Sequence, residues 1–440
     1  MRIETVISCR ESETLREKYY HIRHKSGLDI YVIPKKMSTA YALFATRYGG
    51  RDNCFRLEGE VKYTRVPDGI AHFLEHKLFE SADGTDTFER FARLGANANA
   101  FTSTDMTAYE FSCTQNVYES LSVLLDFVTH PHFTDENVAK EQGIIAQEIR
   151  GCEDNPGRCC YYDLLRLLYK KDNVRIEICG TVDSIAEITP AYLYRCYETF
   201  YQLSNMALVV CGDADFEEVV AIADRQLPCT SEKKIERYIE AEPKEIAGKR
   251  KKREMTVARP QFAIGFKDTP PEDPALGLRR AVVMSFLSEL LFGTSGDFYN
   301  DLYRKGLLNA KFSSGYETFR SAALFLLTGE SDDPEEVYSQ VMSYLARVKE
   351  NPPLREDFER LRRVKYAEFV QVFDATDEIA NEFLYHLFAD IDLFDVGEIF
   401  ASITYDEIVT TLNGFFSESC AAMATVYPKT EGDDENGCQN

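Results

Sequence analysis

The sequence predicts an α+β protein built from two related domains. Segments rich in β-branched and aromatic residues, typical of strands, alternate with segments of helical period in both halves of the chain. Residues 188–201 also match residues 403–416 at a constant spacing of 215, and an apolar strand follows each copy. With 440 residues, the chain is long enough to give two such domains sizeable cores.

In the first half, the strands are expected at residues 28–34, 41–48, 98–103, 107–113 and 206–211. Helices are expected at residues 87–94, 117–128, 161–169, 190–200 and 216–226. A further helix follows Pro67, which suits the first turn. Another begins at Thr134 or Asp135, either of which can cap it, and continues to about Cys152. Residues 51–65 show no clear period.

Residues 229–255 are polar, charged and poor in aromatic side chains. We read them as a linker between an N-terminal domain (residues 1–228) and a C-terminal domain (residues 256–430). In the second half, strands are expected at residues 262–266, 312–316, 322–327 and 421–427, and helices at 276–292 and 407–416, with two long helical stretches between. The polar tail, residues 431–440, is expected to be disordered.

The charge balance argues against nucleic acid and membrane surfaces as partners. The chain has 50 basic and 73 acidic residues, a net charge of −23, which opposes binding to phosphate backbones and anionic lipids. Residues 249–253 form one basic run. It fits either a nucleic-acid patch or a solvated linker, and we favour the linker.

Cysteine usage and the N-terminus favour a cytoplasmic protein. Residues 1–18 lack the apolar core of a signal peptide, and no run approaches the ~18 apolar residues of a membrane span. The 12 cysteines are scattered, without a Cys-x-x-Cys pair. We therefore expect reduced thiols.

The strongest chemical signal lies in residues 68–79. His72 and His76 are four residues apart, with Glu75 directly before the second. On a helix the two imidazoles share one face and can bind one metal ion, with zinc the best fit. Glu75 can then reach a metal-bound water without being a ligand, the inverse of the His-Glu-x-x-His order. The alternative is a surface helix with two incidental histidines.

Glu141 and Glu148 lie seven residues apart on the helix expected after Thr134, so both face the same way. The residues between them are partly apolar, and a carboxylate in such surroundings needs a partner. A metal at the histidines would provide one. The alternative is two glutamates that face solvent.

If the halves are related, residues 78–79 correspond to residues 291–292. The three motif residues then correspond to Ser285, Ser288 and Glu289, which are not a metal-binding set. We therefore expect only the first domain to hold a metal.

The motif set resembles the pitrilysin/insulinase metallopeptidases, the inverzincins. The resemblance rests on residues 72–76, on Glu141 and Glu148 at 65 and 72 residues beyond His76, and on residues 99–102 and 148–156. It covers most of the chain and is closest to bacterial members of mitochondrial-processing-peptidase size, often encoded as two related subunits. It implies two domains, each a mainly antiparallel sheet packed with helices, which together form one half of a clamshell.

The resemblance further implies one zinc ion per chain, bound by His72, His76 and Glu148. Glu75 would be the general base and Glu141 a helper beside the site. Three protein ligands leave a fourth position for water, as catalytic zinc sites require. Zinc lowers the pKa of that water to roughly 7, so Glu75 can accept its proton near neutral pH.

Substrate binding is implied for residues of one strand: Asn99, Ala100, Phe101 and Thr102. In the family this is an edge strand that pairs with the substrate backbone. The alternative is an ordinary edge strand.

The second half departs from the family. Members often carry the pattern Leu-Arg-x-Lys-Gly-Leu-x-Tyr, whose arginine and tyrosine contact substrate near the metal. Here Tyr303 stands in place of the arginine and Asn309 in place of the tyrosine, with Arg304 as a shifted substitute at best. This favours a heterodimer with a motif-less relative that has the pair; a homodimer is the alternative.

Together, these features predict a zinc endopeptidase that hydrolyses short or unfolded peptides, as the catalytic subunit of that heterodimer. Two alternatives stay open. One is a non-catalytic scaffold or assembly subunit with the same fold. The other is a dedicated protease for peptide maturation or modification.

Overall fold

The computed structural model describes residues 5–229 and 233–429, so the expected tail lies outside the described residues. Its contacts divide the chain into two compact units. Unit 1 comprises Met1–Ile149, Ile176–Ile239 and Tyr366–Gly397, and unit 2 comprises Arg150–Arg175, Glu240–Lys365 and Glu398–Asn440. This division differs from the expected sequential boundaries, because residues 150–175 join unit 2 and residues 366–397 join unit 1.

Unit 1 contains a mainly antiparallel sheet in the order β1-β2-β3-β9-β4-β8-β7, in which only the β3–β9 pair is parallel. Its strands are β1 (Val6–Ser12), β2 (Glu17–Arg23), β3 (Asp29–Pro34), β4 (Ala40–Thr46), β7 (Ala96–Thr102), β8 (Thr107–Cys113) and β9 (Met206–Gly212). Strands β4 and β9 are buried along their whole length. The sheet therefore carries packed helices on both faces.

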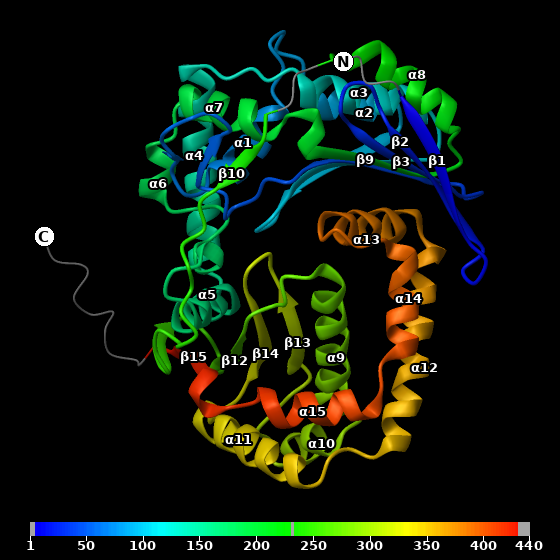
Figure 1. The fold of residues 1–440 in the computed structure, drawn as a ribbon. Coiled ribbons are helices and arrows are strands. Elements are labelled where there is room, and N and C mark those ends of the chain that lie inside the picture. Colours follow the sequence, from blue (N-terminus) through cyan, green and yellow to red (C-terminus); the bar gives the residue numbers. More distant parts are fainter. Residues whose placement is uncertain (1–4, 230–232, 430–440) are drawn as a thin grey trace, which may run out of the picture. The chain divides into compact units, whose positions relative to one another are not determined.

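Most helices of unit 1 lie on one face of this sheet, as Figure 1 shows. They include α1 (Ile70–Leu78), α2 (Thr87–Arg93), α3 (Val117–Thr129), α4 (Asp135–Glu153), α6 (Val182–Ala186), α7 (Pro190–Phe200) and α8 (Phe216–Gln226), with the short helix η2 (Leu203–Asn205). The opposite face is covered by α13 (Thr376–Phe388), which packs on β4 and β9. A late segment of the chain thus completes the core of unit 1.

A second, small sheet of unit 1 corrects two expectations. It has the order β10-β5-β6, with β5 (Cys54–Leu57), β6 (Thr64–Arg65) and β10 (Ile235–Arg237). The sequence of residues 51–65 shows no clear hydrophobic period, yet this segment contributes two strands, β5 and β6. The expected linker contributes β10 here and β11 (Arg250–Met255) to unit 2, so it is not a plain connection.

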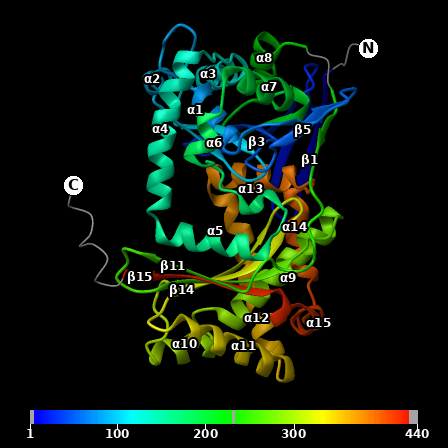
Figure 2. The same cartoon turned by 90° about the vertical axis from the view of Figure 1, so that its left-hand side faces the viewer.

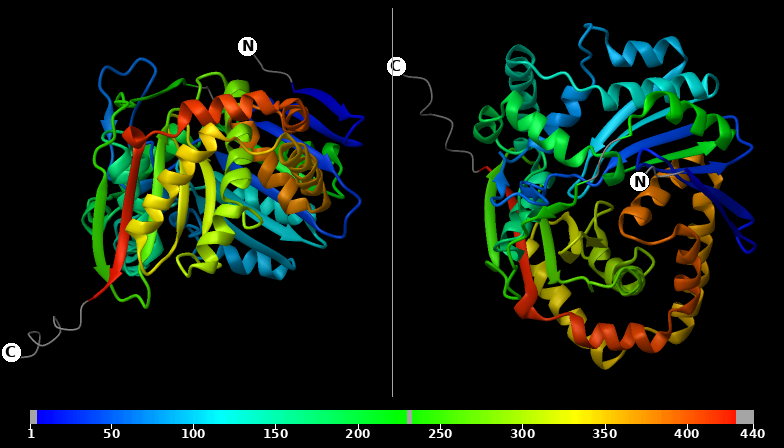
Figure 3. Two further views of the ribbon diagram at one scale, coloured as in Figure 1. Left: turned by 90° about the horizontal axis from the view of Figure 1, so that it is seen from below. Right: turned by 45° about the horizontal axis from the view of Figure 1, so that its top comes forward.

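Unit 2 contains a sheet in the order β11-β15-β12-β14-β13. The remaining strands are β12 (Gln261–Asp268), β13 (Ser313–Thr318), β14 (Ala323–Glu330) and β15 (Ala421–Pro428). Figure 3 shows β15 beside β11, its parallel neighbour. Helix α5 (Pro156–Leu168) lies on one face, close above Gly265, where an added Cβ would come within 2.8 Å of the Leu168 side chain. A larger residue than glycine would require the leucine side chains of this helix to shift.

The other face of this sheet carries several helices, as Figure 2 shows. They are α9 (Pro274–Phe292), α10 (Asp297–Arg304), α11 (Pro334–Glu350) and α15 (Tyr405–Phe415). The short helices η1 (Asn173–Arg175) and η4 (Glu418–Cys420) also belong to unit 2, and η3 (Val372–Asp374) belongs to unit 1. Boundaries between the units fall inside α4, near its C-terminal end, and inside α12 (Arg355–Gln371) and α14 (Leu393–Ser402).

The two sheets confirm the predicted duplication and the α+β fold class. The order β3-β9-β4-β8-β7 in unit 1 has the same strand directions as β11-β15-β12-β14-β13 in unit 2. The elements α7, η2 and β9 each begin 215 residues before α15, η4 and β15. Thr189 and Thr404, also 215 apart, cap the two equivalent helices with their side chains.

The basic run has a structural role in unit 2. Lys251 Nζ lies 2.7 Å and Arg253 Nε 2.9 Å from the carboxylate of Asp163 on α5. The Asp163 side chain is only 2% exposed, and despite its burial these cations hold its pKa below the usual value. The run is therefore part of a strand that neutralises a buried charge. Among the residues that the structure describes, no helix combines the length and apolar character needed to span a membrane.

We expect Asp163→Asn to destabilise the protein by about 2 kcal/mol, because it removes charge-assisted hydrogen bonds and leaves three cations, Lys251, Arg253 and Arg166, beside a neutral group. Urea unfolding of the full chain measures the change. Lys252→Ala is the control, because this neighbouring cation is 60% exposed and pairs with an exposed glutamate rather than with Asp163. If Asp163→Asn lowers the free energy of unfolding no more than the control does, the proposed role of Asp163 is contradicted.

A pH effect is expected at the start of α15. Glu407 accepts hydrogen bonds from Arg279 and Thr404, which lower its pKa to about 2. Because the folded-state pKa lies below the unfolded value, the stabilisation is present above pH 4.5 and disappears as the pH falls toward 2. The difference in unfolding free energy between wild type and Glu407→Gln should therefore shrink over this interval. Asp406→Asn, at a side chain 85% exposed, should show no such convergence.

Candidate active site

Helix α1 begins at a tight backbone junction in unit 1. Gly69 has φ of +91°, and a Cβ there would lie 2.5 Å from the Cys179 carbonyl oxygen. Gly180, with φ of +73°, would likewise meet the backbone of Asp68 at 2.4 Å. Two glycines therefore permit the close approach that fixes the start of α1. The Ser184 hydroxyl strengthens it by donating to the Asp68 carbonyl at 2.8 Å.

The two faces of α1 differ in character. Phe73 and Leu74 are fully buried in the core of unit 1. The predicted motif residues His72 and His76 project from another face, with ring centroids 4.6 Å apart. The helix thus presents both imidazoles on one side, one turn apart, as the spacing predicted.

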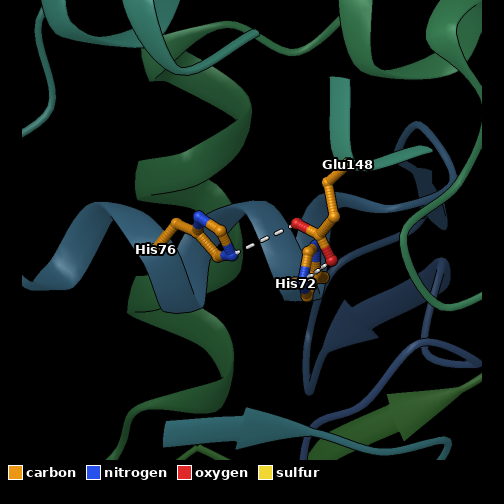
Figure 4. A group of neighbouring side chains, drawn as sticks. All are labelled: His72, His76 and Glu148. Atoms are coloured by element: carbon orange, nitrogen blue, oxygen red, sulfur yellow. Dashed lines mark ion pairs between the residues drawn. The ribbon is translucent and has the colours of Figure 1, made fainter. Parts of the chain in front are cut away.

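Helix α4 brings two glutamates to these histidines. One oxygen of the Glu148 carboxylate lies 3.5 Å from His72 Nε2, and the other lies 3.7 Å from His76 Nε2. Figure 4 shows the carboxylate pointing between the two rings. Glu141, two turns earlier on α4, reaches the other ring nitrogen of His76, with Oε1 3.1 Å from Nδ1. Both glutamates face the site, so the solvent-facing alternative does not hold for Glu141, which is buried.

The arrangement of His72, His76 and Glu148 fits a metal ion. Their donor atoms all lie within 4.8 Å of one another. In tetrahedral zinc coordination, neighbouring donor atoms are about 3.3 Å apart, close to the two distances to Glu148. Two imidazoles and a carboxylate form the donor set of hydrolytic zinc sites. Within the described part of the chain, no second group of this kind was found.

Glu75 sits beside these donors. It is 8% exposed, and the hydroxyl of Thr102 on β7 donates to its Oε2 at 2.7 Å. Burial raises the pKa of Glu75, and the Thr102 hydrogen bond and the nearby His76 partly offset this effect. The carboxylate is therefore held in one orientation by a strand and is shielded from bulk water, as a proton acceptor requires.

Lys77 was missed by sequence reasoning. It is fully buried, with Nζ 2.6 Å from Glu80 Oε2 and 3.6 Å from Glu141 Oε2. Although burial opposes ionisation of Glu141, its contacts with His76 and Lys77 lower its pKa. Although burial also disfavours protonation of His76, the hydrogen bond to Glu141 and the surrounding carboxylates raise its pKa. The sequence signal was a lysine inside an apolar stretch, with a glutamate three residues later.

The predicted substrate-binding strand lies at an edge. β7 is the last strand of the sheet and pairs with β8 on one side. Asn99 is exposed, and Ala100, Phe101 and Thr102 are partly buried. Thr102 also contacts Glu75, so this strand connects the sheet edge directly to the candidate site.

The equivalent region of unit 2 has different chemistry. Ser288, which the sequence repeat aligns with Glu75, shares a hydrogen bond of 2.6 Å with Ser314 on β13. Tyr303 is 53% exposed on α10. Arg304 forms a local ion pair with Asp301, and Asn309 donates to Glu330 at 3.0 Å.

Two family models match the chain. The one described as Insulinase (Peptidase family M16) matches residues 59–182, which include the site of unit 1. The one described as Peptidase M16 inactive domain matches residues 187–365. Most of the second match lies in unit 2, where the structure shows no metal-binding group among the described residues.

Individual proteins resemble the chain over nearly its whole length. It is 39% identical over 427 residues to the zinc protease YmfH of Bacillus subtilis, described as uncharacterized, with 96% of this chain and 99% of YmfH covered. A crystal structure described as an M16-like peptidase from Alicyclobacillus acidocaldarius matches with a TM-score of 0.89 at 33% identity, covering 98% of this chain and all of that one.

Pitrilysin shares the fold, with a TM-score of 0.72 at 15% identity, covering 97% of this chain but 47% of pitrilysin. The confirmed fold, the family models and the identity to YmfH agree. The chain belongs to the insulinase family of peptidases, M16, whose relatives are named as zinc proteases.

Proposed function

We propose that this chain is a zinc-dependent endopeptidase that hydrolyses short or unfolded peptides. The observation that carries the proposal is the convergence of two imidazoles and a carboxylate from α1 and α4, with Glu75 beside them. His72, His76 and Glu148 would bind one zinc ion per chain. A scaffold protein has no need of this arrangement, so we favour an enzyme.

In the proposed reaction, zinc supplies a Lewis acid that polarises the scissile carbonyl and makes water a better nucleophile. Glu75 accepts the proton of the attacking water and returns it to the leaving amine. The Thr102 hydroxyl keeps the Glu75 carboxylate oriented. Glu141 fixes the ring of His76 through Nδ1, which leaves Nε2 directed at the metal position.

The substrate would bind by extending the sheet at β7. Residues Asn99 to Thr102 lie at the sheet edge and end at the contact with Glu75. Main-chain pairing requires an extended segment and tolerates many side chains. This supports short or unfolded peptides rather than folded proteins as substrates.

We expect Glu75→Gln to lower peptide cleavage about 100-fold or more, because it removes the proton acceptor. Its zinc content should stay at one ion per chain, since the proposal assigns Glu75 no ligand role. His76→Ala should lose both zinc and cleavage. Fluorogenic peptide assays and metal analysis measure these quantities on the chain purified with and without its partner.

Glu89→Gln provides the matched control, because this glutamate is 58% exposed on α2 and pairs only with Arg93. Cleavage undiminished in Glu75→Gln would contradict the proposed base. Wild-type protein without zinc would contradict the metal site. A full biological effect retained in His76→Ala would favour the scaffold alternative.

We also propose that the active form is a heterodimer with a related subunit that lacks the metal motif. Tyr303 and Asn309 stand where family members often have a substrate-binding arginine and tyrosine. Arg304, the shifted substitute, forms a local ion pair with Asp301. The partner would contribute that pair, and a homodimer remains the competing assembly.

The chain alone should therefore cleave peptides poorly, and the double variant Tyr303→Arg/Asn309→Tyr should increase its kcat/KM by restoring substrate contacts. Activity assays of the isolated chain, with size-exclusion chromatography to record its oligomeric state, test this. An isolated wild-type chain that is already fully active, and that the double variant does not improve, would contradict the need for a partner.

We propose the cytoplasm as the location. Among the described residues, 11 cysteines are free thiols, several of them buried. A reducing compartment suits this composition.

A further inference from the structure

We propose that Lys77 is a positioning residue of the metal site, which acts through Glu141 on His76. The proposal rests on the proposed function, since it concerns how the ligand His76 is held. It assigns a role to a side chain that touches neither the metal donors nor the expected path of the substrate.

The first observation is the burial of Lys77. Its side chain has no exposed surface, although it lies on a short helix one residue after His76. A buried ammonium group is costly unless it is paired, and an apolar side chain of similar length would be less costly at the same place. A cation at this position is therefore explained best by the anions that it contacts.

The second observation is a continuous series of contacts that ends at the metal position. Glu80 Oε2 lies 2.6 Å from Lys77 Nζ, an ion pair that lacks hydrogen-bond geometry. The same Nζ lies 3.6 Å from Glu141 Oε2, and Glu141 Oε1 lies 3.1 Å from His76 Nδ1. The two oxygens of one buried carboxylate thus have different partners, one on each of two consecutive residues of α1.

Because its two oxygens contact different residues, the Glu141 carboxylate is held in one orientation. With Lys77 at one oxygen, the other oxygen is directed at His76 Nδ1 and accepts its N–H. The proton then resides on Nδ1, and the lone pair of Nε2 faces the donors His72 and Glu148. Without Lys77, the Glu141 carboxylate can rotate, and the ring of His76 loses its aligned acceptor.

The test is the zinc affinity of Lys77→Met, which keeps an unbranched side chain and removes the charge. We expect the dissociation constant for zinc, measured by competition with a chelating indicator, to rise about tenfold to a hundredfold, the usual effect of losing an outer partner of a metal ligand. Lys140→Met is the matched control. Lys140 is the other cation near Glu80, with Nζ 3.6 Å from Oε1, but its side chain is 69% exposed.

A double-variant comparison separates positioning from a general structural role. Glu141→Gln should weaken zinc binding by itself, and Lys77→Met should cause no further loss in the Glu141→Gln background. Wild-type zinc affinity in Lys77→Met overturns the proposal, and so does a loss that is equally large in both backgrounds. Circular dichroism of the metal-free variants identifies any that fail to fold, and Glu80→Gln, at a half-buried residue, then serves as a milder variant with the same expected direction.

A measurement without zinc distinguishes this proposal from the proposed function. At alkaline pH, where the imidazole is neutral, long-range ¹H–¹⁵N NMR reports which nitrogen of His76 carries the proton. In metal-free wild type we expect Nδ1–H, with an increased share of Nε2–H in Lys77→Met. An unchanged tautomer overturns the role of Lys77. If wild type binds no zinc but the tautomer shifts as expected, the metal proposal fails and the positioning role stands.

Discussion

The candidate site depends on the concentration of negative charge between α1 and α4. Glu75, Glu141 and Glu148 surround two imidazoles within one layer of unit 1. Two of these carboxylates are largely buried, where unpaired charges are costly. The positive charge of Lys77 compensates the negative charge of one carboxylate, Glu141. The negative charge that remains makes the space between His72, His76 and Glu148 favourable for a cation. The metal proposal therefore follows from charge as well as from the spacing of the donor atoms.

The rest of unit 1 holds these groups in place. Buried Phe73 and Leu74 anchor α1, and the paired glycines Gly69 and Gly180 fix where this helix begins. Strand β7 adds the hydroxyl of Thr102, so the edge of the sheet and the acidic side chain are joined by a single hydrogen bond. Because the donors come from packed elements rather than loops, little rearrangement is needed to bind a metal.

The two copies of the duplicated fold differ in the side chains that they offer for chemistry. Both units use the same strand order, and their helices α7 and α15 have the same length and the same kind of cap. In unit 2 the counterpart of Glu75 is Ser288, which forms a neutral hydrogen bond with Ser314. The two copies thus share a fold but not the candidate site, since packing depends on apolar residues and not on the site's polar ones.

The sequence alone determined what depends on local spacing. The positions of α1, α3, α4, α7 and α8, the two histidines on one face, and the repeat at 215 residues all follow from periodicity and pairwise matching. It also placed Asn99 to Thr102 on an edge strand through a family resemblance. The strands β1 and β2, and those in residues 51–65 and in the expected linker, were not found, because their residues lack a clear alternation of apolar and polar side chains.

Only the tertiary structure decided which distant segments meet. Helix α13 has an apolar face formed by Ile379 and Phe383, but no local pattern shows that this face covers the sheet of unit 1. In the same way, the basic strand β11 neutralises Asp163, and Lys77 contacts Glu141 across 64 residues of chain. Side-chain periodicity records which face of an element is buried, whereas the partner of a buried charge is set by how the elements pack.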